Sequence, residues 1–317
     1  MKKGWLIAAI ALLLAGIAIC VVSLSMLRFH FSALSTEAFE TNTYPVEGKI
    51  NQISITAETD KITFLPAKDG KCKVVCSETK KITHEVKAKN GELSIRTEDK
   101  RTWVDHIGLH LGTPEITVYL PAGAYGQIVI ETDTGDVEIP ADFSFVTLRI
   151  QGDTSDVDCR ADVSGAMEIA LSTGNITLAE LDAGSLNLSV STGHVDVESV
   201  TCKGDVNIHV GTGRTELDGL TCANLSTEGS TGKITLKDVV ASGSFNIKRS
   251  TGDVRFENSD AAEIFVNTST GEVTGTLRSE KIFFTESDTG KENVPKSVTG
   301  GRCEITTDTG DIEIEIA

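Results

Sequence analysis

Apolar and polar residues alternate on both sides of a Thr-Gly pair that recurs along most of the chain. In one copy Leu186 and Leu188 precede the pair, Val195 and Val197 follow it, and Val200 adds a third apolar position. Alternation with a period of two on either side of a turn predicts two short strands, each with one buried face. No sustained helical period follows residue 40, so the pattern indicates an all-β fold.

The turn pairs recur at steps of 19 or 20 residues, with Ser155 in place of one glycine. A single repeat cannot bury its own apolar face, but stacked repeats can, because each strand pairs with its equivalent in the next coil. The sequence therefore predicts a parallel, right-handed β-solenoid of about ten coils over residues 126–317. The Thr-Gly pairs are Thr134-Gly135, Thr173-Gly174, Thr192-Gly193, Thr212-Gly213, Thr231-Gly232, Thr251-Gly252, Thr270-Gly271, Thr289-Gly290 and Thr309-Gly310.

These pairs are expected to be structural. Glycine reaches the positive φ that a sharp corner needs, and threonine side chains can bond to the turn backbone. Stacked threonines would then form a ladder along one edge of the solenoid. A phosphate-binding P-loop is excluded, because no Gly-Lys-Ser/Thr follows the pair and no helix opens after it.

Residues 46–125 echo the repeat without keeping its period, and they predict a β region that caps the N-terminal end of the stack. One coil is expected around Asp60, which stands in the glycine place. A hairpin is expected across Asn90-Gly91, and a strand that ends at Pro121.

The last strand, residues 311–317, has no sequence after it. Its backbone edge is therefore expected to be open, and open edges invite pairing with another chain. We expect weak self-association through this C-terminal edge strand, opposed by the charges of Glu313 and Glu315.

An uncharged stretch near the N-terminus is long enough to cross a bilayer. It predicts a retained transmembrane signal-anchor helix over residues 5–27, with a cytoplasmic tail of residues 1–4 and a juxtamembrane linker of residues 28–45; cleavage of the segment is the alternative. Lys2 and Lys3 precede the segment and Arg28 follows it. The positive-inside rule then places the N-terminus in the cytoplasm and the solenoid outside the cell membrane.

The chain carries 29 Lys and Arg against 46 Asp and Glu, a formal charge of −17. Nucleic-acid binding is disfavoured, because a phosphate backbone requires a basic face. Aromatic residues make up only 5%, which disfavours a stacking platform for bases or sugars.

At this point the residues resemble a family. The N-terminal helix, the strand from Ile116 to Pro121 and the repeated Ser/Asp-Thr-Gly turns are similar to the bacterial DUF4097 family, also called "putative adhesin". The resemblance covers about residues 46–317. It implies a surface-facing protein of the bacterial envelope and carries no catalytic residues over to this chain.

Four acids flank two successive turns: Asp133 and Asp136, then Asp153 and Asp156. Stacked carboxylates repel one another unless a cation bridges them, and Ca²⁺ prefers such oxygen ligands. They are candidates for a calcium site, and calcium is the one cofactor that the sequence suggests; a solvated acidic edge is the alternative.

Cys202 and Cys222 occupy equivalent places one coil apart. Stacked neighbours lie within the Cα distance of a disulfide, so a bridge between them is a candidate, with two buried free thiols as the alternative.

The pattern favours a non-enzymatic function: a tethered solenoid that acts as an adhesin-like binding protein or an envelope scaffold, with an envelope protein or a glycan as partner. The first alternative is an envelope-stress or regulatory component that acts through a membrane partner. A polysaccharide-acting enzyme is less favoured, because the regular steps from Gly135 to Gly310 leave no long loop to wall a cleft.

Overall fold

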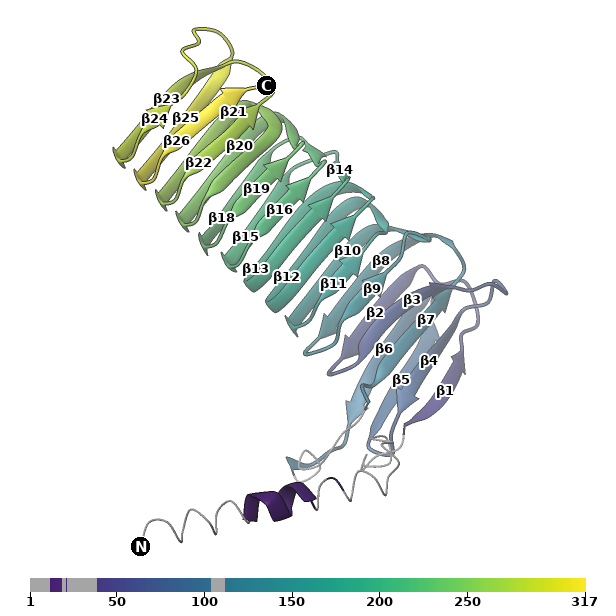
Figure 1. Cartoon of the computed structure of the whole chain (residues 1–317). Helices are drawn as coiled ribbons and strands as arrows, with labels where there is room; N and C mark the ends of the chain where they lie inside the picture. Colours follow the sequence, from purple (N-terminus) through teal and green to yellow (C-terminus); the bar gives the residue numbers. More distant parts are fainter. Residues whose placement is uncertain (1–11, 19–20, 22–38, 104–111) are drawn as a thin grey trace, which may run out of the picture.

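The computed structural model describes residues 12–18, 21, 39–103 and 112–317. Its strands form one continuous 26-stranded sheet that winds into a rod of stacked coils (Figure 1). The prediction of an all-β parallel solenoid of about ten turns is confirmed. In the described part of the chain, α-helical geometry is confined to residues 12–18 and 21.

The coils stack in the register that the repeat predicts. In β12 (Asp162–Ala179) and β13 (Asp182–Glu198) one strand runs through the turn from one face of the rod to the next. Their pairing is parallel and sets Ile169 beside Leu188 and Gly174 beside Gly193. The alternating apolar residues point into the rod, where Leu188 is fully buried, while Asn187 beside it is exposed.

Two long ladders run the length of the rod, one on each side of the turn. The ladder before the turn contains β2 (Gln52–Ala57), β8 (Gly123–Thr132), β10 (Phe143–Thr154), β12, β13, β15 (Val206–Thr212), β18 (Leu225–Thr231), β20 (Val240–Thr251) and β21 (Val254–Thr270). The ladder after it contains β3 (Lys61–Pro66), β9 (Val137–Ile139), β11 (Val157–Cys159), β12, β13, β16 (Thr215–Asp218), β19 (Ile234–Lys237), β21 and β22 (Val273–Leu277). The short strands β14 (Thr201–Cys202) and β17 (Thr221–Cys222) belong to a third face.

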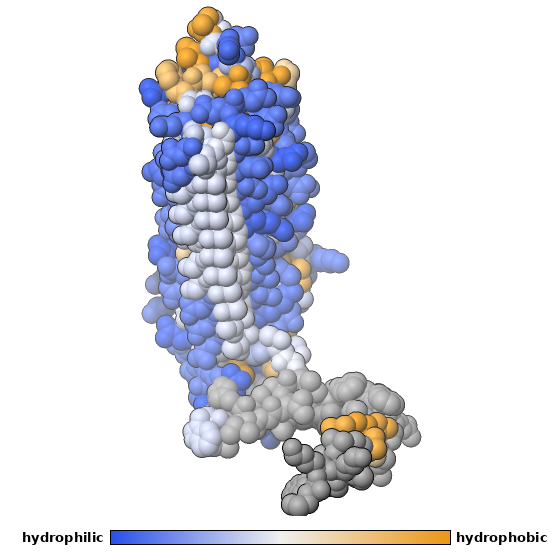
Figure 2. Space-filling model, turned by 60° about the vertical axis from the view of Figure 1, so that its left-hand side comes forward, coloured by the Kyte–Doolittle hydropathy of each residue, from blue (hydrophilic) through white to orange (hydrophobic). Residues whose placement is uncertain are grey.

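The turn glycines are required by the approach of the neighbouring coil. Gly193 has a φ of +148°, and a Cβ added to it would lie 1.8 Å from the carbonyl oxygen of Gly174. Successive threonines pair in register, as Thr173 does with Thr192. A pale stripe of intermediate hydropathy runs along the rod in Figure 2, the colour that stacked Gly, Ser and Thr give.

Ser155 fits into this ladder with a local compensation. It is buried, and a Cβ at Gly152 would lie 2.9 Å from its hydroxyl oxygen. Glycine at position 152 thus leaves the space that the serine side chain fills.

The N-terminal β region lies at one end of the rod. The first rung is Asp60, since a Cβ at Gly135 would lie 1.8 Å from its carbonyl oxygen. The hairpin across Asn90-Gly91 is present, with both residues at positive φ. Antiparallel strands close this end: β1 (Glu40–Pro45) on β4 (Lys73–Glu78), β4 on β7 (Glu115–Leu120), and β5 (Ile82–Lys89) on β6 (Glu92–Asp99).

At the other end the order of the coils departs from the order of the chain. β25 (Gly301–Thr309) lies between β21 and β23 (Lys281–Thr289), and β26 (Ile312–Ile316) lies between β22 and β24 (Glu292–Asn293) (Figure 1). The final coil is therefore inserted between its two predecessors. The prediction that the C-terminal strand is the open edge is wrong, because the Ile312 amide donates to the Lys291 carbonyl oxygen.

Side-chain composition explains the inserted coil. The coil of β25 and β26 points Cys303, Ile305, Ile312 and Ile314 inward, and all four are buried. The coil of β23 and β24 offers Thr285 and exposed Glu292 at equivalent places. Covering a coil on both sides buries more of its apolar surface, so the more apolar coil gains more free energy from the inner position.

The predicted transmembrane segment, residues 5–27, falls mostly outside the described residues. Among the residues that are described, no helix has the length and apolar character needed to cross a membrane.

Candidate functional site

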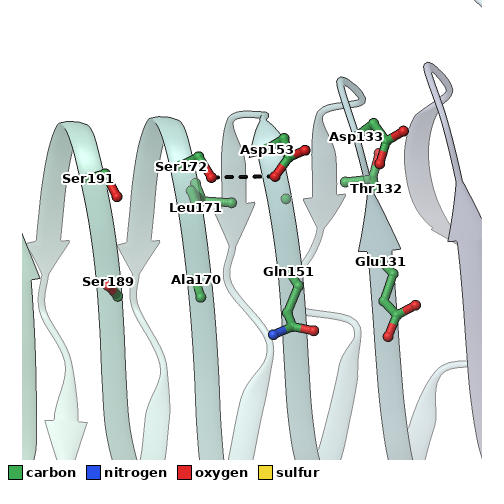
Figure 3. A pocket seen from close by; sticks show the side chains of 11 residues that line it. Glu131, Thr132, Asp133, Gln151, Asp153, Ala170, Leu171, Ser172, Ser189 and Ser191 are labelled. Carbon is green, nitrogen blue, oxygen red and sulfur yellow. Dashed lines mark hydrogen bonds between the residues drawn. The ribbon is translucent and has the colours of Figure 1, made fainter.

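A groove of about 590 Å³ lies on the side of the rod, just before the turn, across the coils of β8, β10, β12 and β13 (Figure 3). Most of its residues occupy outward positions of the alternating pattern, while Thr132, Gly152 and Leu171 occupy inward ones at its floor. The groove is lined by Glu131, Thr132, Asp133, Gln151, Gly152, Asp153, Ala170, Leu171, Ser172, Ser189 and Ser191.

The hollow results from small side chains stacked in register. Gln151 pairs with Ala170, and Ala170 pairs with Ser189, so a long side chain on one coil is followed by short ones. In Figure 3 the carboxylates of Asp133 and Asp153 stand on the rim of this hollow.

The chemistry of the groove is that of hydrogen-bond acceptors. Glu131, Asp133 and Asp153 contribute carboxylates, and the Ser172 hydroxyl lies 3.4 Å from Asp153 Oδ1. No lysine, arginine, histidine or cysteine lines it. The arrangement suits a ligand that donates hydrogen bonds, such as a polyhydroxylated one.

The structure separates the four acids considered for calcium. Asp136 Oδ1 accepts from the Asp156 amide at 3.0 Å, and Asp156 Oδ1 accepts from the Asn175 amide at 2.7 Å. These two carboxylates therefore link each coil to the next, whereas Asp133 and Asp153 line the groove. They do not form a group of three close ligands in the part of the chain described; calcium binding itself stays a prediction.

Both candidate disulfide cysteines are buried free thiols in the structure, and the bridge that their spacing allows is not formed. The Cys202 thiol lies 3.7 Å from the Gly184 carbonyl oxygen. Burial raises the pKa of the Cys222 thiol to about 12, which keeps it protonated and unreactive.

A second candidate site, which the sequence analysis missed, is a buried polar cluster in the N-terminal cap. His84 Nε2 lies 2.8 Å from Asp60 Oδ1, and His84 Nδ1 lies 3.0 Å from Glu78 Oε1. The Thr97 hydroxyl donates to Asp60 Oδ2 at 2.7 Å. All four residues are buried. Cys76 is also buried, and its Sγ lies within 4.8 Å of ligand atoms of Glu78 and His84. We call Asp60, Cys76, Glu78 and His84 the His84 cluster.

The charges in this cluster are set by burial and hydrogen bonds. Burial acts to lower the pKa of His84, but the hydrogen bonds and charges of Asp60 and Cys76 outweigh it and raise the pKa to about 10. Burial acts to raise the pKa of Glu78, yet hydrogen bonds from Asn42, Tyr44 and His84 hold it below its ordinary value. An imidazolium thus lies between two carboxylates.

No repeat pattern reveals this cluster. Its members come from the turn before β3, from β4 and from β5, and only the tertiary fold brings them together. One signal was present in the sequence, because Asp60 stands at a position where most other repeats have glycine. The contact of its carboxylate with buried His84 explains this exception.

The comparisons with known proteins concern the fold. The family model Toastrack DUF4097 matches residues 50–315. No curated protein sequence matches this chain significantly.

Solved structures resemble this chain at low identity. A "putative adhesin" from Parabacteroides merdae is 10% identical, with a TM-score of 0.52 over 76% of this chain and 97% of that one. A "putative adhesin" from Parabacteroides distasonis is 11% identical, with a TM-score of 0.48 over 89% and 98% of the two chains. A "putative lipid binding protein" from Parabacteroides distasonis is 14% identical, with a TM-score of 0.48 over 76% and 95%.

Proposed function

Because the chain belongs to the Toastrack DUF4097 family, we propose that it is a membrane-tethered, non-enzymatic binding protein of the bacterial envelope. In this proposal the solenoid carries an adhesin-like surface outside the cell, and the groove of Figure 3 binds a glycan without acidic groups. The observation that carries the proposal is the row of carboxylate, amide and hydroxyl side chains over four stacked coils. Sugar hydroxyls donate to such acceptors, and an acidic glycan would be repelled by the three carboxylates.

The groove offers carboxylate, amide and hydroxyl groups for binding. A polysaccharide-acting enzyme usually holds its substrate in a cleft walled by long loops, and the regular repeat steps from Gly135 to Gly310 provide no such loop beside the groove. This favours binding over hydrolysis.

The proposed glycan site is tested with an array of neutral, amino and acidic glycans, probed with the wild-type protein and two variants. Asp153→Asn removes a charged acceptor, and Ala170→Tyr fills the hollow. Asp153→Asn is expected to weaken binding about tenfold, because a hydrogen bond to a charged group contributes about 1.5–3 kcal/mol. Ala170→Tyr is expected to weaken binding about as much, because its ring occupies the space of the ligand.

Glu263→Gln is the matched control, since Glu263 is an exposed acid on the rod away from the groove. Equal binding by all four proteins, or binding of none of the glycans, would remove the groove from the proposal. Capture of a single envelope protein instead of a glycan would favour the regulatory alternative.

The membrane tether rests on the uncharged stretch that follows Lys2 and Lys3. A reporter active only in an oxidising compartment, fused after Ala317, is expected to be active, and a reporter active only in the cytoplasm is expected to be silent. The reverse result would contradict the proposed topology.

A further inference from the structure

The His84 cluster contains three good transition-metal ligands on adjacent strands. Cys76 and Glu78 are two residues apart on β4, so their side chains share one face, and His84 comes from β5. The Sγ, carboxylate and imidazole ligand atoms all lie within 4.8 Å of one another. We propose that Cys76, Glu78 and His84 bind one Zn²⁺-like divalent ion, with Asp60 orienting the imidazole.

The distances suit a tetrahedral ion. With bonds of about 2.0–2.3 Å, the ligand atoms of a zinc site are about 3.3–3.8 Å apart. His84 Nδ1 and Glu78 Oε1, at 3.0 Å, need to move apart by a few tenths of an ångström. No pair of ligand atoms is more than about 1 Å too far apart, and a water molecule takes the fourth position. Thiolate, imidazole and carboxylate together favour zinc over calcium or magnesium, which prefer oxygen ligands alone.

Asp60 supplies the outer-shell contact that metal-bound histidines usually have. Its Oδ1 accepts from His84 Nε2 at 2.8 Å, and Thr97 fixes its other oxygen at 2.7 Å. A carboxylate on one imidazole nitrogen fixes the tautomer and directs the other nitrogen at the metal. Here that other nitrogen is Nδ1, which lies 3.0 Å from Glu78 Oε1.

Anionic groups would compensate the buried ion. With Zn²⁺ bound, the Cys76 thiolate and the carboxylates of Glu78 and Asp60 would surround the doubly charged ion and a neutral imidazole. The positive charge of the ion would therefore not be left uncompensated in the interior.

An exposed edge strand covers the cluster and offers a route for the ion. Among the described strands β1 pairs only with β4, and its residues are mostly exposed. It holds Glu78 through the Asn42 amide and the Tyr44 hydroxyl, which donates at 2.8 Å. Opening of β1 would expose Glu78, and a bound ion would tie β4 and β5 to the first rung at Asp60.

The test uses the full-length chain, stripped of metal by a chelator and titrated with Co²⁺ and with Zn²⁺. We expect one ion per chain, a thiolate-to-cobalt charge-transfer absorption band, and a melting temperature that rises with Zn²⁺. Cys76→Ser should abolish the charge-transfer band. Asp60→Asn should lower the affinity about 10–100-fold while the band persists.

Cys72→Ser is the matched control, a half-buried thiol in the same region that should leave the band unchanged. The titration of the wild-type protein tests the proposal by itself, so the outcome does not depend on whether a variant folds. Wild-type protein that binds no Co²⁺, or binds it without a thiolate band, overturns the proposal. So does Cys76→Ser protein that binds Co²⁺ with unchanged spectrum.

Discussion

At the scale of single residues, the inward positions of the repeat carry the stability of the rod. Leu188→Asp would bury an unpaired carboxylate between coils and is expected to lower the free energy of unfolding by several kcal/mol. Asn187→Asp, on the exposed face of the same strand, should cost less than about 1 kcal/mol. Thermal or urea unfolding compares the two, and equal losses would contradict the register of β13 with its neighbours.

One inward position holds a charge. Arg249 is only 3% exposed, and its Nη1 donates to the Val210 carbonyl oxygen at 2.8 Å, while Nε and Nη2 have no partner among the described residues. Gly229 leaves the space for it, since a Cβ there would lie 2.0 Å from Nη1. Burial lowers the pKa of the guanidinium, the sign of an unfavourable environment for its charge.

Arg249→Met should therefore leave the melting temperature unchanged or raise it, because replacing a buried charge by an apolar side chain of similar length is neutral or stabilising. Arg149→Met is the control, since Arg149 is half-exposed and pairs with Glu168 at 3.1 Å. A large loss of stability in Arg249→Met alone would mean that the guanidinium makes a favourable contact in the folded protein.

At the scale of elements, a short loop leads the chain from the outermost coil back into the inserted coil. Residues 294–300 connect β24 to β25, and Glu280 holds them: Glu280 Oε2 accepts from the Thr299 hydroxyl at 2.7 Å and from the Ser297 hydroxyl at 3.1 Å. These hydrogen bonds lower the pKa of Glu280.

Because the pKa of Glu280 is lowered in the folded protein, its carboxylate stabilises the loop fully above the ordinary carboxyl pKa. This stabilisation is lost as the pH falls through the lower pKa of the folded protein. Protection of the Thr299 amide from hydrogen exchange, corrected for the intrinsic rate, should therefore decrease in acid. Glu280→Gln should show low protection at every pH. Protection in the wild type that does not change down to full protonation would contradict this role.

At the scale of the whole molecule, the inserted coil moves the open edge from the C-terminal strand to β23. Apolar side chains gather at this end of the rod in Figure 2. Phe284 is 51% exposed on β23, and Val298 is 88% exposed in the loop beside it. An edge strand with exposed apolar side chains is a pairing site.

Self-association is therefore predicted through β23, strengthened by salt, because Glu286, Asp288 and Glu292 are exposed near this edge and repel a second copy. Sedimentation of residues 39–317 at low and high salt should show a dimer that Phe284→Glu dissociates. Val146→Glu, which changes an equally exposed side chain away from this end, should not. A monomer under all conditions would show that the edge is merely solvated.

The sequence by itself determined the architecture and the register of the coils. Each strand pairs with a copy of its own pattern, so the period of the Thr-Gly turns sets which residues lie side by side, as for Gly174 and Gly193. The same logic placed Asp60 as the first rung, and the local preference of Asn90-Gly91 for positive φ determined the hairpin.

Only the tertiary structure decided the order of the last two coils and the makeup of both candidate sites. The local pattern around Gly290 and Gly310 fits either order, and the choice depends on how much apolar surface each coil buries against its neighbours. The groove forms where neighbouring coils place short side chains side by side at their outward positions. The His84 cluster joins three segments that have no repeat period in common. Such contacts are set by packing between elements, where sequence spacing carries no information.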